Sequence, residues 1–288
     1  MCLNINKYQQ GSLTMFESPG ISFATRHQIH LTWKKPDNKP EKFTIKMKYL
    51  DLESTPTFTL TSKKMLLNEL YKTFEQPLPT GNYHITFKTA TDEHEMTFVL
   101  PAMGRVSKGG SCFLIDGKDF GYDKWCIMTN HHVIGDTKNK EIRVMFDEVH
   151  LRLRYWYFKT HTNQNQGLDY TIVGLTKEQM NMLKEANIYP NKLDFNSEFK
   201  HNGCMLIHKP NSVHCRVLYT PCKVVKRTPT RVRYEYLGES TAGGSSGSPV
   251  FAMNSNKEIA IQGIHKAKGV CIKMKSIKED MMMTNKKK

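Results

Sequence analysis

The chain has 288 residues, of which 24% are charged, and a formal net charge of +15 at pH 7. This length is sufficient for two domains with separate cores, and the absence of any apolar run of 18 residues excludes a predicted transmembrane helix. Seven cysteines without CxxC spacing, together with an N-terminus lacking a signal-peptide profile, favour a reduced intracellular protein over a disulfide-stabilised or zinc-binding one.

The basic charge belongs to the second part of the chain. Residues 1–100 contain 12 Lys/Arg against 10 Asp/Glu, whereas residues 101–288 contain 30 against 17. A basic surface attracts acidic partners such as nucleic acid or anionic peptide. The alternative is that the charge, including a terminal run of three lysines, serves solubility. Nucleic acid is therefore a candidate partner of the second half, and no membrane association is expected.

The first hundred residues predict a small α+β domain. Residues 1–20 are polar and are expected to be a flexible lead-in. Residues 63–74 predict a helix, because four apolar side chains share one face after a candidate N-cap, Ser62. Strand patterns cover residues 21–35, 43–49, 57–61, 83–88 and 95–100. From residue 43 to residue 100, the order strand, strand, helix, strand, strand resembles a ubiquitin-like β-grasp module. We assign this module to residues 21–102 and expect it to have a structural or partner-docking role.

The remaining residues, 103–288, predict a mainly β domain. Thr176 begins a capping-box sequence, TKEQ, that is typical of the start of a short helix. Strand patterns cover residues 109–115, 125–134, 167–175, 217–219, 223–226 and 231–236.

The stretch STAGGSSGSPVF, residues 240–251, is the most informative part of the domain. Nucleophile loops of serine proteases have this form, with Ser246 exposed and the backbone N–H groups of Gly244 and Ser246 directed at one point. Fixed donors at such a point stabilise an oxyanion. Gly and Ser are also what any tight turn uses, so a base and a residue that orients it are required to support the catalytic interpretation.

The sequence supplies candidates for both groups. The strand WCIMT leads into NHHVI, which contains His131 and His132, and chemistry alone does not distinguish these two as a base. Asp169 lies at the start of a β-branched strand and is our candidate for the acid of a triad. Asp136 and Asp147 are rivals, but Asp136 is close to the histidines in a polar loop and Asp147 is followed by charge.

The segment TNHHV resembles the Thr-Asn-x-His-Val pattern of chymotrypsin-fold serine proteases, such as the Deg/HtrA and glutamyl endopeptidase groups. In that pattern the histidine directly before Val is catalytic, which selects His132. The resemblance implies a double six-stranded β-barrel and a catalytic triad of His132, Asp169 and Ser246, in the chymotrypsin-type order. It also implies an oxyanion hole formed by Gly244 and Ser246, with no metal or cofactor.

The resemblance extends to specificity. Thr241 and the sequence GIH, residues 263–265, are similar to the S1 pocket of glutamyl endopeptidases and of picornaviral main proteases, so Thr241, Gly263 and His265 are candidate S1 residues. A hydroxyl and an imidazole both donate to a side-chain carbonyl, and a preference for Glu or Gln at P1 follows. The family usually continues His-x-Gly-Gly, but here KAKG follows, so residues 263–269 carry side chains where the substrate strand is expected to pair.

The vertebrate proteases called "family with sequence similarity 111" also resemble this chain, since they place ubiquitin-like domains ahead of a protease with similar GSGSPVF-type and Leu-Asp-Tyr segments. That likeness implies an intracellular enzyme, in the nucleus or cytoplasm, that acts on DNA-associated proteins and cuts itself. Position 245 is Ser rather than the Asp of digestive trypsins, so control by oligomerisation or partner binding is expected instead of trypsin-style activation.

The sequence therefore predicts a serine endopeptidase acting on protein or peptide substrates. The alternative is a catalytically silent protease-fold module that binds nucleic acid or peptides. The presence of all three triad residue types argues against this alternative, because a silent relative need not retain them.

Overall fold

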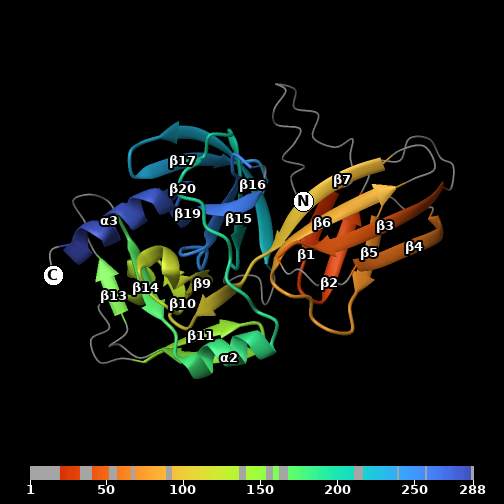
Figure 1. The fold of residues 1–288 in the computed structure, drawn as a ribbon. Helices are drawn as coiled ribbons and strands as arrows, with labels where there is room; N and C mark the ends of the chain where they lie inside the picture. The colour runs from red at the N-terminus through yellow and green to blue at the C-terminus, as the bar shows by residue number, and fades with distance from the viewer. Residues whose placement is uncertain are drawn as a thin grey trace. The chain divides into compact units, whose positions relative to one another are not determined.

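The computed structural model describes residues 20–32, 41–51, 57–65, 69–88, 93–135, 141–153, 158–161, 168–210, 217–238, 240–256 and 258–286. The chain divides into two compact units, residues 1–100 and 101–288 (Figure 1). The expected flexible lead-in, residues 1–20, lies outside the described residues apart from Gly20.

The first unit consists of two antiparallel sheets. The three-stranded sheet has the order β1-β2-β5, formed by Gly20–Ala24, Gln28–Thr32 and Glu69–Thr73. The four-stranded sheet has the order β4-β3-β6-β7, formed by Thr57–Met65, Glu41–Tyr49, Gly81–Lys88 and Glu93–Leu100. Buried side chains of the unit include Met47, Tyr49, Leu78, Tyr83, Ile85 and Phe98.

The helix predicted over residues 63–74 is wrong. The segment instead contains the end of β4 and all of β5, and β5 pairs with β2 from Gln28↔Thr73 to Thr32↔Glu69. The partner strand lies about 40 residues earlier in the chain, and strand preference depends on such cross-strand neighbours rather than on the local pattern. A single strand was also predicted from residue 21 to 35, but residues 20–32 form a hairpin of β1 and β2. The helix required by the ubiquitin-like order is thus not found among the described residues of this unit.

The second unit is mainly β, as the sequence predicts, and its first sheet contains seven strands in the order β12-β11-β8-β9-β10-β14-β13. These strands are Val149–Leu153, Ile142–Phe146, Met103–Val106, Gly110–Asp116, Trp125–Thr129, Tyr170–Gly174 and Phe158–His161. Among the described residues, no pairing joins the edge strands β12 and β13, so this sheet forms a half-barrel there.

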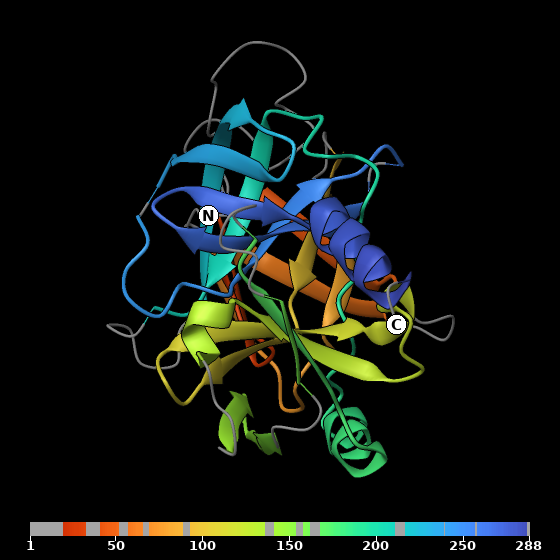
Figure 2. The ribbon, with the colours of Figure 1, turned by 90° about the vertical axis from the view of Figure 1, so that its left-hand side faces the viewer.

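The second sheet of this unit is a closed six-stranded barrel in the order β15-β16-β17-β20-β19-β18. Its strands are Gly203–His208, Leu218–Arg227, Arg231–Tyr236, Val270–Lys273, Ile259–Ala267 and Pro249–Met253. Two strands predicted separately, 217–219 and 223–226, are both part of β16, which continues through Pro221. In Figure 2 the barrel strands are coloured teal to blue, and the strands of the first sheet yellow to green.

Short helices connect and cover these strands. The helix α1, His131–Ile134, follows β10, and a 3-10 helix, η2, covers Gly117–Phe120. The helix α2, Lys177–Glu185, has the predicted capping box between Thr176 and Gln179. The last helix, α3, Met274–Lys286, contacts β19, β20 and η2.

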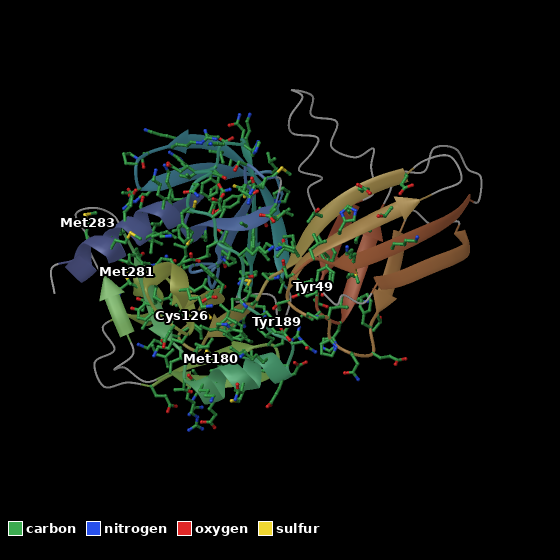
Figure 3. All side chains as sticks on the ribbon, in the orientation of Figure 1. Tyr49, Cys126, Met180, Tyr189, Met281 and Met283 are labelled. Atoms are coloured by element: carbon green, nitrogen blue, oxygen red, sulfur yellow. The ribbon has the colours of Figure 1, made fainter. Side chains whose placement is uncertain are left out.

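Each sheet of the second unit encloses its own apolar core. In the first, Leu114, Ile127, Val144 and Val173 are buried, and Met180 of α2, labelled in Figure 3, packs against them. In the barrel, Phe199, Leu206, Cys204, Cys222 and Cys271 are buried together. The described cysteines are all free. No helix within the described ranges is long and apolar enough to cross a membrane.

Candidate active site

The candidate base and acid are brought together by two strands of the first sheet. His132 lies in α1 directly after β10, and Asp169 directly precedes β14, which pairs with β10 from Cys126↔Gly174 to Thr129↔Thr171. The start of α1 is fixed because Val133 and Ile134 are buried, and Gly110 leaves the space into which Val133 packs. A Cβ at Gly110 would lie 2.4 Å from Val133 Cγ1.

His132 and Asp169 form a bidentate contact. The distance from His132 Nδ1 to Asp169 Oδ2 is 2.7 Å, and the backbone N–H of His132 donates to Asp169 Oδ1 over 3.1 Å. Asn130 Nδ2 donates to the carbonyl oxygen of Asp169 over 2.8 Å, which fixes the backbone of the acid. The Asp169 side chain is 10% exposed, whereas that of His132 is 47% exposed. The imidazole therefore contacts the carboxylate through Nδ1, while about half of the side chain is open to solvent.

Burial alone would raise the pKa of Asp169, but the hydrogen bonds from His132 and the charge of Lys266 lower it to about 2. Lys266 Nζ lies 3.4 Å from Asp169 Oδ2, the oxygen that also contacts His132 Nδ1. The acid is consequently ionised at neutral pH. An ionised carboxylate accepts only, so in the neutral imidazole of His132 the proton lies on Nδ1 and the lone pair on Nε2.

The loop containing Ser246 is fastened to β9 by Ser111. The N–H of Ser111 donates to the Ser246 carbonyl over 2.8 Å, and Ser111 Oγ donates to the Gly244 carbonyl over 2.8 Å. Thr129 Oγ1 donates in turn to the Ser111 carbonyl over 2.7 Å. This serine follows two glycines in the sequence, but no local signal indicates that it binds a loop 135 residues away. Sequence reasoning missed it for that reason.

The loop is also fastened to the barrel. Gly247 N–H donates to the His265 carbonyl over 3.0 Å, and His265 N–H donates to the Ser248 carbonyl over 2.8 Å. Gly244 and Gly247 have φ of 93° and 87°, values that favour glycine. Neither Gly244 N–H nor Ser246 N–H donates to an acceptor in the part of the chain that the structure describes. These are the two donors predicted to bind an oxyanion.

The Ser246 hydroxyl is not hydrogen-bonded to His132. Its Oγ donates to the carbonyl oxygen of Lys266, at 2.8 Å. The structure thus brings His132 and Asp169 together, and it places the hydroxyl of Ser246, in the loop before β18, against Lys266 of β19. Lys266 contacts both parts of the site, through its carbonyl and its ammonium, and it was recognised from the sequence only as a departure from a glycine-rich pattern.

The two polar S1 candidates are each held by a tyrosine of β17. His265 is 1% exposed, and its Nδ1 lies 2.5 Å from Tyr234 Oη. Thr241 Oγ1 lies 2.9 Å from Tyr236 Oη, which accepts from Gly269 N–H over 2.7 Å. Burial, with smaller contributions from the charges of His208 and His132, lowers the pKa of His265 to about 3.

Gly263 occupies a different environment. It is buried in β19 and pairs with Val250 and Lys273. A Cβ at this position would lie 2.9 Å from Cys271 Sγ and 3.1 Å from Phe199 Cζ, both in the barrel core. The requirement for glycine here comes from core packing.

A substrate strand can pair with only part of residues 263–269. Gly263 and Ile264 already pair with β18, so the edge of β19 that faces β18 is unpaired only beyond His265.

Comparisons with known proteins were made at the level of sequence and of structure. No protein-family model matches this chain, and no curated protein matches it. Among solved structures, the chain is similar to kallikrein-related peptidase 10, with a TM-score of 0.45 and 10% sequence identity, covering 65% of this chain and 97% of that chain. The architecture described above, a closed six-stranded antiparallel barrel and an open antiparallel sheet, is consistent with the chymotrypsin-like fold that the motifs predict.

Proposed function

We propose that this protein is a serine endopeptidase in which Ser246 is the nucleophile, His132 the general base and Asp169 the residue that orients the base. The observation that carries the proposal is the bidentate contact between His132 and Asp169, at 2.7 Å and 3.1 Å, adjacent to a glycine-rich serine loop. An ionised carboxylate on Nδ1 fixes the tautomer in which Nε2 accepts a proton, and it stabilises the imidazolium that forms.

The reaction would begin with rotation of the Ser246 hydroxyl from the Lys266 carbonyl towards His132 Nε2. Oγ then attacks the carbonyl carbon of the scissile peptide bond while its proton passes to Nε2, and the carbonyl oxygen becomes an oxyanion. The N–H groups of Gly244 and Ser246 are the donors for that charge. The C–N bond breaks as Nε2 returns the proton to the leaving amine, and water attacks the acyl-enzyme by the same route in reverse.

For specificity, we propose that glutamine is accepted at P1 better than glutamate. Tyr236 Oη accepts a hydrogen bond from Gly269 N–H, so the Tyr236 hydroxyl can donate to Thr241 Oγ1. The hydroxyl of Thr241 is then left to donate to a carbonyl oxygen of the substrate. Tyr234 donating to His265 Nδ1 leaves the imidazole proton on Nε2, a second neutral donor. Neither S1 group carries a positive charge at neutral pH, and burial of a carboxylate without a cationic partner is costly.

The proposal is tested by covalent labelling with a fluorophosphonate probe, which reacts with an activated serine. The expected result is labelling of the wild type at Ser246 and none for Ser246→Ala or His132→Ala. A matched control is Ser255→Ala. Ser255 donates its backbone N–H to Ser197 Oγ, and the alanine keeps this hydrogen bond. A wild type that is never labelled and cleaves no peptide of a mixed library would overturn the proposal.

A second candidate is a silent module that binds nucleic acid. The observation that favours it is the resting geometry, in which Ser246 bonds to Lys266 rather than to His132, together with exposed Lys223, Lys226 and Arg233 on β16 and β17. Titration of a DNA duplex at several salt concentrations tests this candidate directly, because phosphate contacts make affinity fall with salt.

A further inference from the structure

The residue directly before the candidate nucleophile is anchored inside the barrel. Ser245 is 1% exposed, and its Oγ lies 2.8 Å from Nδ1 of His208, the last residue of β15. His208 is completely buried, and its other ring nitrogen, Nε2, lies 3.0 Å from Thr220 Oγ1 on β16. An imidazole with both nitrogens bonded to hydroxyls on either side is fixed in position and orientation.

All three polar groups of Ser245 point into the protein. Its N–H donates to the Ala242 carbonyl and its carbonyl accepts from Ser248 N–H, both over 3.2 Å, while its hydroxyl meets His208. In a trans peptide the C=O and N–H point in opposite directions. Because the Ser245 carbonyl is directed at Ser248, the N–H of Ser246 in the same peptide group is directed the opposite way, and it has no acceptor among the residues described.

We infer that His208 is a positioning residue that holds the oxyanion-binding peptide in its working orientation through Ser245. The inference rests on the proposed function, since the donor that is oriented belongs to the proposed oxyanion hole. Its physical basis is preorganisation: donors that are already aligned with the developing charge need no reorganisation during the reaction. The buried imidazole remains neutral around pH 7, since burial lowers its pKa to about 4.

This arrangement has a consequence for how the protein becomes active. The anchor for the loop comes from β15, a strand of the barrel itself, and not from a chain end released by cutting. Within the barrel, the peptide group between Ser245 and Ser246 is therefore oriented without a new chain end.

The test is a kinetic comparison of Ser245→Ala with the wild type on a cleaved peptide. Loss of the anchor is expected to lower kcat about 10- to 100-fold, somewhat less than removal of an oxyanion donor itself, with KM changed less than about threefold. The matched control is Ser276→Ala, which removes another buried serine hydroxyl, bonded to the Pro229 carbonyl over 3.1 Å, and should leave both constants unchanged. A kcat for Ser245→Ala equal to that of the control would overturn the inference.

Changes at His208 provide the second arm. His208→Asn keeps a polar group near the position of Nδ1 and is expected to retain more activity than His208→Leu, which keeps none. Equal kcat for these two folded variants would count against positioning through Ser245. If His208→Leu does not fold, Ser245→Ala alone decides the question. A wild type without activity means failure of the proposed function, whereas an active wild type with an equally active Ser245→Ala means failure of this inference only.

Discussion

The hydroxyl of Ser246 donates to the carbonyl oxygen of Lys266 over 2.8 Å, so the proposed nucleophile rests on the strand along which a substrate would lie. Beyond His265, the edge of β19 on this side is not paired with β18, and a substrate N–H that bonds to the Lys266 carbonyl would compete with Ser246. Binding of substrate would then release the hydroxyl to His132. The resting contact is thus compatible with catalysis, provided that the substrate breaks it.

The carboxylate of Asp169 is the first group to test. Asp169→Asn keeps the shape of the side chain, but an amide can donate as well as accept. When the amide donates to Nδ1, the proton of the His132 imidazole lies on Nε2, which is the wrong tautomer for a base. We expect kcat to fall by about 10⁴ with little change in KM. Steady-state kinetics at neutral pH give the value. A loss of less than about tenfold would mean that Asp169 is not the orienting acid.

Lys266 offers a smaller and more specific perturbation. Lys266→Met removes the ammonium 3.4 Å from Asp169 Oδ2, so the pKa of Asp169 should rise from about 2 while the His132 bonds still hold it below its ordinary value. A raised carboxyl pKa means that protonation begins at higher pH on acidification. The midpoint of the Asp169 carboxyl titration, followed by ¹³C NMR of the folded protein on acidification, should therefore move to higher pH. Lys266→Arg, which keeps the charge, is the control and should show no such movement.

Gly247 and Gly121 form a matched pair for the nucleophile loop. Both have positive φ, 87° and 80°, so alanine at either position costs about 1 kcal/mol of backbone strain. A Cβ at Gly247 would also lie 2.1 Å from the Ser111 carbonyl oxygen, whereas a Cβ at Gly121 meets nothing within 4 Å. We expect Gly247→Ala to abolish labelling of Ser246 and to lower the Tm much more than Gly121→Ala. Equal effects on labelling would contradict the described packing of the loop.

The buried histidines predict the acid stability of the fold. The pKa is about 4 for His208 and about 3 for His265 in the folded state, against about 6.5 in an unfolded chain. The unfolded state therefore binds the extra protons first, and stability is complete above about pH 6.5 and is lost as the pH falls towards these folded values. Each histidine should contribute a slope of about 1.4 kcal/mol per pH unit within its window.

Urea unfolding at a series of pH values between 7 and 4.5 measures that slope. His208→Asn removes one titrating group and should reduce the slope to about half, whatever its effect on absolute stability. A slope that is the same in the variant and in the wild type would mean that His208 is not a neutral buried group.

The S1 proposal predicts a change in specificity without a change in the nucleophile. His265→Leu removes a buried donor, so cleavage after glutamine should fall by about 10²-fold or more in kcat/KM, because an unpaired polar substrate group is strongly rejected. Fluorophosphonate labelling of Ser246 should stay within a fewfold of the wild type. Paired peptides ending in Gln or Glu at P1 give the preference, and cleavage after Phe or Tyr but not after either of these would contradict the pocket.

The candidate acid and base could be predicted because their signals are local. The residues TNHHV and the strand that starts at Asp169 each contain their own motif, and the pairing of β10 with β14 brings them together. Ser111 and Lys266 carry no such signal, since their importance lies in contacts with a loop that the sequence places far away or on another strand.

The prediction for the first unit was also limited by contacts between residues that are far apart in the chain. The apolar residues of 63–74 fit one face of a helix, yet β5 is stabilised by pairing with β2, a neighbour that a local pattern does not identify. The closed barrel was predicted through the resemblance of TNHHV and the serine loop to chymotrypsin-fold proteases, and not from periodicity, since strands such as β15 and β18 are buried along their whole length. The edge strands of the first sheet among the described residues, β12 and β13, are set by long-range pairing, and periodicity contains no information about that.

Ser111 belongs to the first sheet, and the loop it binds belongs to the barrel. Neither half alone can order the nucleophile, since the loop needs donors from β9 on one side and backbone partners from β19 on the other. A nascent chain that has completed only one half would therefore carry no competent site. Under the proposed function, such a requirement delays proteolytic activity until both halves are assembled.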